Sequence, residues 1–501
     1  MKKLVIIRRS SQVFSFVLFT YILWSTTYPL HGIFPPDTFF KINPLIIIFT
    51  SISERVVVPG IVAAIFMLVL TLILGRFFCG WICPLGAIID TAGAVRKNQA
   101  EFPEKKNKLL PSIKYYVLGI IALFSFAGLQ VAWVFDPMVI TARFISLNLI
   151  PALTFGVDRV LVHIIRALNF YSPLYDFYRL LKASVLGINV YYFSHSGIIL
   201  TFFVVICAST FITKRFWCRS ACPLGAIYAL TARFSLLRRT VDKCITCLKC
   251  KAHCRTAAIK DDLGYIKGEC ILCMDCIYEC TIHKTRFAWP SSRKLSKEGD
   301  SAISRREFIF LIFGSFFLLG FKNRYRRRRE VGSVIRPPRA LKEEDFLDRC
   351  IRCGNCMKVC ITNGLQPVIL ESGIGGIWTP QLIPEIGYCE YKCTLCGKVC
   401  PTGAIPSLSL EQKKKTRLGL AEIDLSICLP WAEDKECIVC EEHCPVSDKA
   451  IKLKSHNTGS QTVLRPYVNF DLCIGCGICQ KKCPTRPVRA IKVFPYKSDR
   501  T

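Results

Sequence analysis

Cysteine spacing is the feature of this sequence that most directly indicates chemistry. The chain has 501 residues and 29 cysteines, and most of them recur at gaps of two or three residues. Two runs have the spacing C-x2-C-x2-C-x3-C, in which three thiolates on one tight loop bind one [4Fe-4S] cluster and the fourth binds its neighbour. The expected ligand sets are Cys244, Cys247 and Cys250 with Cys280, and Cys270, Cys273 and Cys276 with Cys254.

Four further groups of four cysteines follow nearer the C-terminus. They are Cys350, Cys353, Cys356, Cys360; Cys389, Cys393, Cys396, Cys400; Cys428, Cys437, Cys440, Cys444; and Cys473, Cys476, Cys479, Cys483. Six groups predict about six [4Fe-4S] clusters. How the ligands pair within 350–483 stays open.

Other uses of dense cysteines fit this chain less well. A disulfide framework is typical of short secreted scaffolds, and zinc ribbons use two C-x2-C pairs that lie far apart. The sequence has no C-x-x-C-H motif for covalent haem and no glycine-rich dinucleotide fingerprint. Iron-sulfur electron transfer is the chemistry that remains.

A second cysteine pattern occurs twice in the apolar half of the chain. The segment 76–88 aligns with 215–227, and each copy contains C-x3-C-P-L-G. The four cysteines could hold a metal or cluster, cycle between dithiol and disulfide, or pack as inert thiols. They are Cys79, Cys83, Cys218 and Cys222. The remaining cysteine, Cys207, lies in an apolar segment and is interpreted as a core residue.

The formal charge of +31, with a run of arginines over 326–329, first suggests a nucleic-acid partner. Anionic clusters would offset part of this charge, and many of the other basic residues flank apolar segments. Basic flanks of that kind orient membrane helices. We therefore expect a membrane partner and no nucleic acid.

Apolar runs predict four membrane helices, since about 20 apolar residues cross a bilayer. They lie near residues 12–30, 56–75, 115–135 and 194–213. The basic flanks place the N-terminus in the cytoplasm and direct the connections around residues 31 and 136 outward. The stretch 141–182 mixes apolar residues with arginines and is interpreted as an interfacial helix.

A shorter apolar run, 308–321, follows Ser304-Arg305-Arg306-Glu307-Phe308. That sequence resembles an internal twin-arginine export signal, which predicts an anchor helix and a periplasmic C-terminal domain. The expected domains are a membrane domain (1–240), a two-cluster domain (241–290), a linker with the anchor (291–330) and a four-cluster domain (331–501). The fold class is a membrane α-helical bundle, with four spans and one anchor helix, carrying α+β ferredoxin-like domains.

A quinone site is indicated only by polar residues near the predicted outward ends of the helices. His31, Asp136 and His195 lie there, where a quinone ring could bind and protons could leave. Hydration at the membrane interface is the alternative role for each.

Residues 1–290 resemble the NapH-type membrane ferredoxins through the paired C-x3-C-P motifs and the two-cluster module. Residues 304–490 resemble the MauM/NapG family of exported ferredoxin-type proteins, although Ile361 replaces the family's proline after Cys360. The stretches that carry this second resemblance include Glu344-Asp-Phe-Leu-Asp-Arg-Cys350, Gly376-Ile-Trp-Thr-Pro380 and Cys400-Pro-Thr-Gly-Ala404.

The resemblance implies a fusion of two proteins that move electrons from membrane quinol towards a periplasmic reductase or cytochrome. The predicted function is therefore electron transfer from the quinone pool through about six [4Fe-4S] clusters in the cytoplasmic membrane. Its rival is a maturation factor that supplies electrons for metal insertion into another enzyme. Genomic neighbours would separate the two, because a terminal reductase supports transfer and a metal-trafficking set supports assembly.

Overall fold

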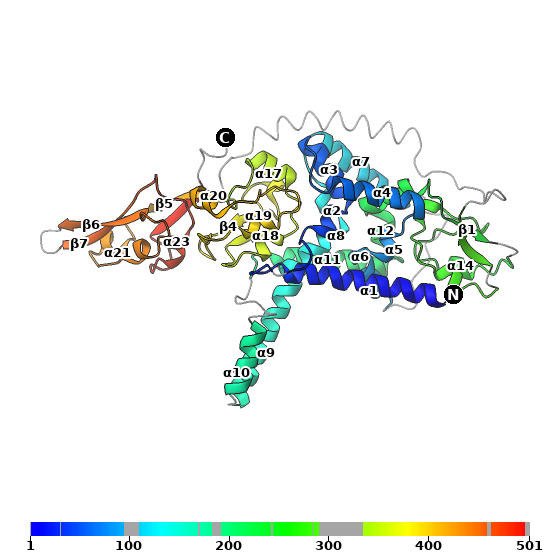
Figure 1. Cartoon of the computed structure of the whole chain (residues 1–501), viewed down its shortest axis with the longest axis horizontal. Helices are drawn as coiled ribbons and strands as arrows, with labels where there is room; N and C mark the ends of the chain where they lie inside the picture. Colours follow the sequence, from blue (N-terminus) through cyan, green and yellow to red (C-terminus); the bar gives the residue numbers. More distant parts are fainter. Residues whose placement is uncertain are drawn as a thin grey trace. The chain divides into compact units, whose positions relative to one another are not determined.

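The computed structural model describes residues 2–30, 32–94, 110–168, 171–182, 192–241, 244–282, 284–289, 334–457 and 462–495 (Figure 1). These residues form two compact units, each built from separated parts of the chain. Unit 1 draws on Met1–Leu23, Asp37–Phe144 and Gly197–Arg326, and unit 2 on Trp24–Pro36, Ile145–Ser196 and Arg327–Thr501. This division cuts across the four consecutive domains expected from the sequence, because two connections of the apolar half pack with the C-terminal residues.

Unit 1 is mostly helical, with one small ferredoxin-like part. Its α-helices in the apolar half are α1 (Lys2–Ser25), α2 (Thr38–Lys41), α3 (Pro44–Glu54), α4 (Ile61–Leu74), α5 (Phe78–Trp81), α6 (Pro84–Ala94), α7 (Ile113–Phe126), α8 (Pro137–Phe144), α11 (Ser196–Ala208), α12 (Phe216–Ser220) and α13 (Pro223–Ala232). The ferredoxin-like part contains β1 (Arg238–Val241), α14 (Lys249–Ala252), α15 (Asp275–Tyr278) and β2 (Thr285–Ala288). Strands β1 and β2 pair antiparallel.

The predicted membrane segments each contain a helix, but most of these helices are short. α4 and α7 have 14 residues and α11 has 13, whereas about 20 residues cross a bilayer. Glycines in left-handed backbone limit α4, since Gly60 (φ 106°) precedes it and Gly75 (φ 96°) follows it. The four-span bundle therefore remains a prediction.

Among the described residues, one helical stretch is long and apolar enough to cross a membrane, judged by length and composition. It runs over Pro137–Ala167, where α8, a π-helical turn (Ile145–Leu149) and α9 (Ile150–Leu168) are continuous. The sequence predicted an interfacial helix over most of this stretch. The anchor predicted over 308–321 lies outside the described residues.

Unit 2 carries three antiparallel strand pairs that hold short helices and cysteine loops. Its other helices are α10 (Tyr171–Leu181), α17 (Glu343–Arg349), α18 (Asn355–Lys358), α19 (Leu395–Lys398), α20 (Leu410–Lys415), α21 (Leu429–Ala432), α22 (Val439–Glu442) and α23 (Ile478–Lys482). Its strands are β3 (Leu365–Pro367), β4 (Pro380–Leu382), β5 (Gly419–Ile423), β6 (Ile451–Asn457), β7 (Thr462–Val468) and β8 (Ile491–Pro495).

The C-terminal part of unit 2 nests one hairpin inside a second strand pair. β6 and β7 are adjacent in the chain, whereas β5 pairs with β8 across them. The register places Ile423 opposite Ile491 and Gly419 opposite Pro495. This arrangement brings cysteine runs that are distant in sequence into one compact α+β module.

Candidate metal centres

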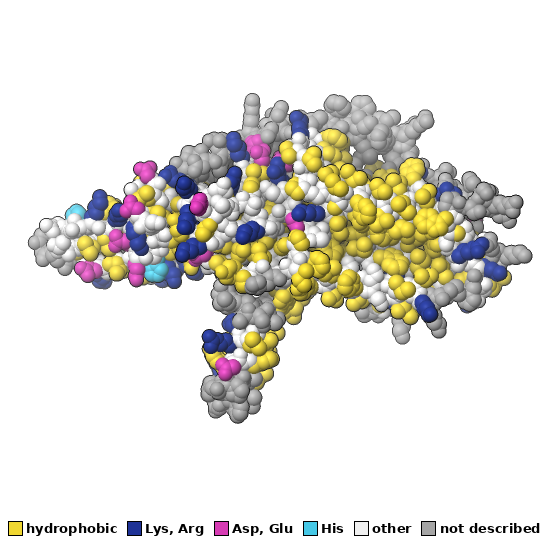
Figure 2. Space-filling view, viewed as in Figure 1, with side chains coloured by type: hydrophobic (Ala, Val, Ile, Leu, Met, Phe, Trp, Pro, Cys, Tyr) yellow, Lys and Arg dark blue, Asp and Glu magenta, His cyan; other side chains and the backbone are white. Residues whose placement is uncertain are grey.

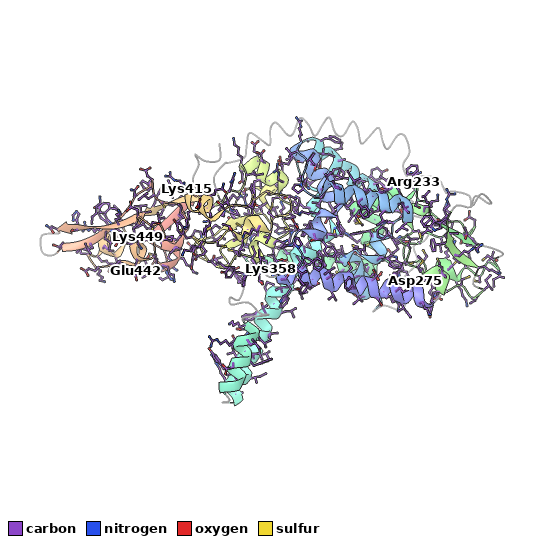
Figure 3. The ribbon with its side chains drawn as sticks, viewed as in Figure 1. Arg233, Asp275, Lys358, Lys415, Glu442 and Lys449 are labelled. Atoms are coloured by element: carbon purple, nitrogen blue, oxygen red, sulfur yellow. The ribbon has the colours of Figure 1, made fainter. Side chains whose placement is uncertain are left out.

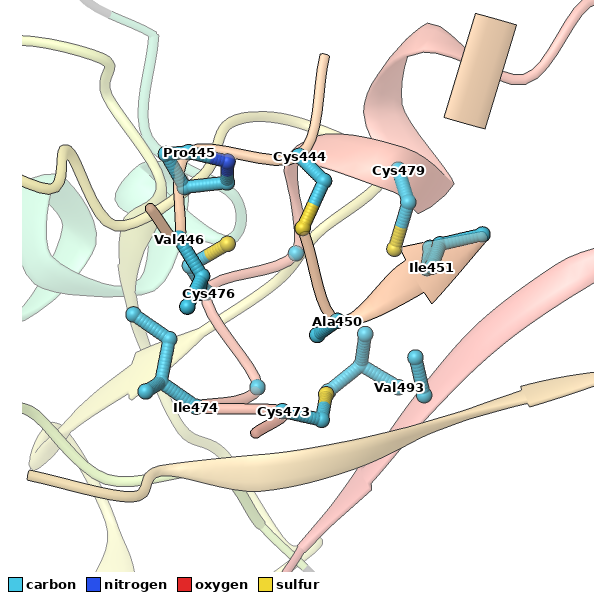
Figure 4. Close-up of a pocket in the computed structure, with 13 residues that line it drawn as sticks. Cys444, Pro445, Val446, Ala450, Ile451, Cys473, Ile474, Cys476, Cys479 and Val493 are labelled. Carbon is cyan, nitrogen blue, oxygen red and sulfur yellow. The ribbon is translucent and has the colours of Figure 1, made fainter. Parts of the chain in front are cut away.

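Four cysteines converge on one cavity beside strand β6 (Figure 4). Cys473, Cys476 and Cys479 come from one run, and Cys444 is the last cysteine of the preceding run. The space measures about 330 Å³, and its other lining side chains are mostly aliphatic. A cavity with apolar walls and four thiols fits a thiolate-ligated cluster.

Two more cavities in unit 2 repeat this crossed pattern of three cysteines from one run and one from the other. The first, of about 370 Å³, is lined by Cys428, Cys437, Cys440 and Cys483. The second, of about 410 Å³, is lined by Cys360, Cys389, Cys393 and Cys396.

A fourth group of cysteines, which follows the same crossed pattern, is indicated by side-chain packing and electrostatics. Cys356 lies within electrostatic range of Cys353, Cys350 and Cys400, and the same region forms one apolar cluster around Phe346. The structure thus favours crossed pairing in 350–483, which the sequence had left open.

In unit 1, one predicted ligand set is brought together. Cys270 and Cys273 each lie within electrostatic range of Cys254, and so does Cys276. Cys250 lies in range of Cys244 and Cys247. Cys280, the fourth ligand expected for the set of Cys244, Cys247 and Cys250, stays a prediction.

The backbone explains how three cysteines on one short loop can face the same point. In four loops, the residues on either side of the central cysteine both adopt left-handed backbone conformations. These pairs are Thr246 and Leu248, Leu272 and Met274, Arg352 and Gly354, and Gly475 and Gly477. Left-handed backbone is costly for residues other than glycine, so the repeated pattern indicates a conformation that the site requires.

Buried thiols in these loops are held in their protonated form in the metal-free chain. Burial raises the pKa of Cys476 to about 12 and the pKa of Cys428 to about 11. Because metal binding requires thiolates, cluster insertion must release these protons.

Lys413 shows that the cavity at Cys389 suits an anionic group. Its side chain is fully buried, and its ammonium lies within hydrogen-bonding reach of the Cys389 thiol. It lies within electrostatic range of Cys389 and Cys396. A buried ammonium beside uncharged thiols is costly, and a cluster with four thiolate ligands would supply negative charge next to it.

A single metal ion fits the described cysteines less well. Within the described ranges, no three His, Cys, Asp or Glu side chains converge closely enough to hold one ion. A tetrahedral zinc site needs such convergence, whereas a cubane places its thiolates on four separate irons.

The two C-x3-C-P copies contact each other through reciprocal arginines. Arg76, which opens the first copy, donates to the carbonyl oxygen of Cys218 at 3.0 Å. Arg215, which opens the second, donates to the carbonyl oxygen of Cys79 at 3.0 Å. Both guanidinium groups are buried, so each arginine belongs to the other copy's site.

Glycine at the end of each motif leaves room for a close neighbour, which is the guanidinium of Arg76 at Gly225 and the first motif's own backbone at Gly86. A Cβ on Gly225 would lie 2.3 Å from Nη2 of Arg76, and a Cβ on Gly86 would lie 2.9 Å from the carbonyl oxygen of Cys79. Such approaches are closer than packed atoms allow. The shared C-P-L-G ending therefore has a steric cause.

Two buried carboxylates complete this charge network. Asp90 accepts hydrogen bonds from Nε and Nη2 of Arg215, both at 2.7 Å. Glu269 pairs with Arg76 at 3.4 Å and also with Lys114. Since Glu269 immediately precedes Cys270, the network reaches the ferredoxin loop of Cys270, Cys273 and Cys276.

The quinone candidates are placed differently from one another. Asp136 is fully buried; it accepts from the Asn43 amide at 2.7 Å and from two backbone N–H groups of α8, so it caps that helix. His195 is exposed and belongs to unit 2. His31 lies outside the described residues.

Several residues of this network were missed from the sequence. Arg76 and Arg215 occupy the same position in the two copies, and this repeated charge was the available signal. Glu269 and Asp90 have no repeated counterpart. Lys413 is the first of three consecutive lysines. The sequence alone does not show which of the three is buried.

Comparisons with known proteins agree with the cysteine geometry. Two protein-family models, both described as a 4Fe-4S binding domain, match residues 56–102 and 196–243 and residues 466–489. The first covers both C-x3-C-P copies. No solved structure matches the chain.

Among curated proteins, the ferredoxin-type protein NapG of Escherichia coli is 37% identical over 172 residues, which is 33% of this chain and 73% of NapG. The methylamine utilization ferredoxin-type protein MauM of Methylorubrum extorquens is 34% identical over 32% of this chain and 73% of MauM. The ferredoxin-type protein NapF of Haemophilus influenzae is 32% identical over 37% of this chain and 92% of NapF. This chain therefore belongs to the family of ferredoxin-type iron-sulfur electron-transfer proteins that includes NapG and MauM.

Proposed function

We propose that this protein is a membrane-bound electron carrier that takes electrons from quinol and delivers them through about six [4Fe-4S] clusters to a periplasmic reductase or cytochrome. The observation that carries the proposal is the contact between the ferredoxin loop at Cys270 and a C-x3-C-P motif. The indole N–H of Trp81 donates to the carbonyl oxygen of Leu272 at 3.0 Å. Each [4Fe-4S] cluster supplies reversible one-electron transfer when bound.

Exposed apolar side chains on the helices of unit 1 support the membrane location. Phe14 on α1 is 68% exposed, and Phe66 on α4 is 62% exposed. Figure 2 shows hydrophobic side chains gathered over these helices, whereas charged side chains are frequent over the C-terminal part of the chain. Apolar surface on this scale marks a face that lipid or a partner covers.

Contacts within unit 2 support a periplasmic C-terminal domain. Lys358 on α18 (Figure 3) is buried and donates to the carbonyl oxygens of Trp24 and Thr26 at 3.1 and 3.0 Å. Trp24 lies in the last turn of α1 and Thr26 directly after the helix, at the end that the positive-inside rule directs outward.

A second connection of the apolar half also packs against the C-terminal domain. The amides of Asn363 and Gln366 donate to the carbonyl oxygen of Tyr192 at 2.7 and 2.9 Å. Tyr192 lies shortly before α11, at the predicted outward end of that membrane segment. The twin-arginine-like segment at Arg305 and Arg306 provides an export route for this domain.

A reporter fused after residue 495 tests the topology. A C-terminal alkaline phosphatase should be active, and changing Arg305 and Arg306 to lysine should abolish that activity. A matched change of Lys322 and Arg324 should leave it intact. A fusion that is active only as a cytoplasmic reporter, whatever occupies 305 and 306, would contradict the proposed location.

Liposomes that contain the purified protein test the electron source. Under anaerobic conditions, a short-chain quinol should bleach the visible iron-sulfur absorbance to the extent set by the cluster potentials. Dithionite gives the full extent as a control. Bleaching by dithionite alone, with no response to quinols of different potential, would remove quinol from the proposal and favour the maturation role.

A further inference from the structure

We propose that the exposed loop of Cys244, Cys247 and Cys250 is a docking surface for an acidic, soluble iron-sulfur protein of the ferredoxin class. Docked there, this partner exchanges single electrons with the cluster expected at that loop. The surface gives the chain a point of electron exchange besides the quinol and the acceptor of the proposed function. It does not depend on quinol, since it belongs to the ferredoxin-like part of unit 1 alone.

The two cysteine loops of this ferredoxin-like part have the same spacing but opposite surroundings. Cys247 is exposed, whereas Cys273, its counterpart in the second loop, is buried. Ile245 is 61% exposed, whereas its counterpart Ile271 is 1% exposed. Among the described cysteines, Cys247 is the one exposed thiol. Since electron transfer between proteins needs two centres to come close, an exposed ligand marks the place where a partner can approach.

The second loop is buried because it packs against the C-x3-C-P repeats. A Cβ on Gly80, in the first repeat, would lie 2.2 Å from the carbonyl oxygen of Ile271. A Cβ on Gly268, just before the loop, would lie 2.7 Å from the carbonyl oxygen of Ala229 in α13. Glycine is what permits backbones to approach so closely. This side of the ferredoxin-like part is therefore covered, and the first loop is the one left for a partner.

Apolar side chains flank the exposed ligand. Ile245 and Leu248 lie on either side of Cys247 within the loop, and both are exposed. Tyr278 is exposed on α15, which packs against α14 at the end of the loop. A small apolar patch with polar surroundings is typical of the weak and transient interfaces of electron-transfer proteins.

Exposed cations border the same loop and favour an acidic partner. Lys249 is exposed in the first loop. Its counterpart in the second loop is Asp275, which pairs with Arg255 at 2.5 Å. Lys284 and Arg286 are exposed shortly after the fourth cysteine expected for the same cluster. Positive charge beside an exposed redox centre attracts an acidic partner and orients it for transfer.

The acidic side chains nearby are engaged within the ferredoxin-like part. Asp261 pairs with Lys251 at 2.6 Å, and Asp262 accepts a hydrogen bond from a backbone N–H of its own turn at 3.0 Å. Glu279 lies 4.0 Å from the ring of His253. Each carboxylate thus faces a cation, a ring N–H or a backbone donor, so these groups do not cancel the positive charge beside the loop.

The electron step needs no other reactant. The reduced iron-sulfur centre of the partner loses one electron and the cluster at the exposed loop gains it, while no bond forms and no proton moves. The neighbouring cluster, expected at Cys270, Cys273 and Cys276, accepts that electron next, because the crossed fourth ligands hold the two clusters beside each other.

Binding of a purified, acidic plant-type [2Fe-2S] ferredoxin to the iron-loaded protein tests the surface without any electron transfer. Both proteins are kept oxidised, and surface plasmon resonance measures the affinity with the membrane protein held in nanodiscs of zwitterionic lipid. We expect binding at about 20 mM salt that weakens at least about tenfold at about 200 mM salt, because salt screens the attraction.

Charge reversal tests the cations. The double variant Lys249→Glu, Lys284→Glu should weaken binding at low salt at least about tenfold. The matched control is Lys415→Glu, Lys452→Glu, which reverses two exposed lysines of unit 2 and should bind like the parent. Parental iron content in both variants shows that the clusters are intact.

A second pair of variants tests the apolar patch. Ile245→Ser removes exposed apolar area without touching a ligand and should weaken binding at least about threefold. Leu425→Ser, at a similarly exposed leucine of unit 2, is its control and should bind like the parent.

Stopped-flow reduction then tests the transfer itself. The same ferredoxin in its reduced form, a donor of about −400 mV, should reduce the clusters of the parent and act at least about tenfold more slowly on the variant reversed at 249 and 284. Dithionite should reduce both proteins to the same extent. No quinol is present, so a protein that passes here but never responds to quinol keeps the docking surface and loses the proposed electron source.

Three results would overturn the docking surface. The first is a parent that binds no ferredoxin at low salt. The second is a variant reversed at 249 and 284 that binds and accepts electrons like the parent. The third is self-association of the parent that the charge reversals abolish, with no ferredoxin bound, which would assign the surface to a second copy of this chain.

Discussion

The guanidinium of Arg76 donates to the carbonyl oxygen of Cys218 at 3.0 Å, although the two residues are 142 positions apart. In the reciprocal contact, Arg215 donates to the carbonyl oxygen of Cys79. The internal repeat is therefore a folded pair, in which each copy completes the other. Buried charge therefore helps to specify how the two copies meet.

The first prediction concerns Asp90, the carboxylate that pairs with Arg215. Asp90 pairs with the buried Arg215 at 2.7 Å and with the buried Arg8 at 3.6 Å, so Asp90→Asn removes the carboxylate that compensates these two cations. We expect it to lower the free energy of unfolding by about 3–5 kcal/mol. The control is Asp261→Asn, which removes an exposed ion pair with Lys251 and should cost less than about 1 kcal/mol. Thermal unfolding in detergent measures both, and equal costs would contradict the buried network.

The second prediction separates crossed from consecutive ligand pairing. With crossed pairing, Cys350 and Cys400 serve one cluster, whereas Cys389 and Cys400 serve two. The double serine variant at 350 and 400 should therefore lose about four irons, and that at 389 and 400 about eight. Consecutive pairing reverses this order. Iron and sulfide analysis of the two variants decides between them.

The third prediction concerns the buried ammonium of Lys413. A unit charge about 5 Å from a cluster contributes about 3 kcal/mol at an effective dielectric of about 20, which corresponds to about 130 mV for one electron. Lys413→Met should lower the reduction potential of the cluster at Cys389 by up to that amount. Lys415 is exposed on the same helix, so Lys415→Met is the matched control. A redox titration that shows equal potentials would place Lys413 outside the cluster's field.

The fourth prediction compares two glycines with left-handed backbone. Gly475 has φ 65° and a Cβ there would lie 2.3 Å from the backbone of Gly419, whereas Gly403 has φ 71° and open space. Alanine at 403 adds only backbone strain of about 1–2 kcal/mol. Alanine at 475 adds overpacking of about 1–3 kcal/mol to that strain. Denaturant unfolding should rank them in this order, and a Gly403→Ala protein as unstable as Gly475→Ala would refute the steric argument.

The cysteine loops could be predicted from the sequence because their chemistry is local. Three cysteines at two-residue gaps, as at Cys473, Cys476 and Cys479, specify one loop whatever surrounds it. The crossing of the fourth ligand could not be predicted in 350–483. For the two runs over 428–483 it depends on how β5 pairs with β8 around an inserted hairpin, and this pairing is a long-range property.

The arginine contacts could not be predicted for a different reason. Arg76 and Arg215 follow apolar helices, and a basic residue at that place is typical of a membrane flank. The burial of Arg76 depends on a glycine from the other copy, Gly225. Likewise the lengths of α4 and α7 are limited by local helix ends, so apolar runs predicted longer spans than the structure shows.

The central claim is that electrons from quinol reach the clusters of both units. Mössbauer spectroscopy on protein enriched in a Mössbauer-active iron isotope, reconstituted in liposomes and treated with excess low-potential quinol, measures the fraction of iron that is reduced. The account predicts reduced iron in the parent and a smaller reduced population in the variant that lacks Cys473, Cys476 and Cys479 of unit 2. The contradicting result is a variant in which dithionite reduces less iron than in the parent, because the unit 2 cluster is missing, but quinol reduces the same amount. Electrons would then stop in unit 1, and the proposed path would be wrong.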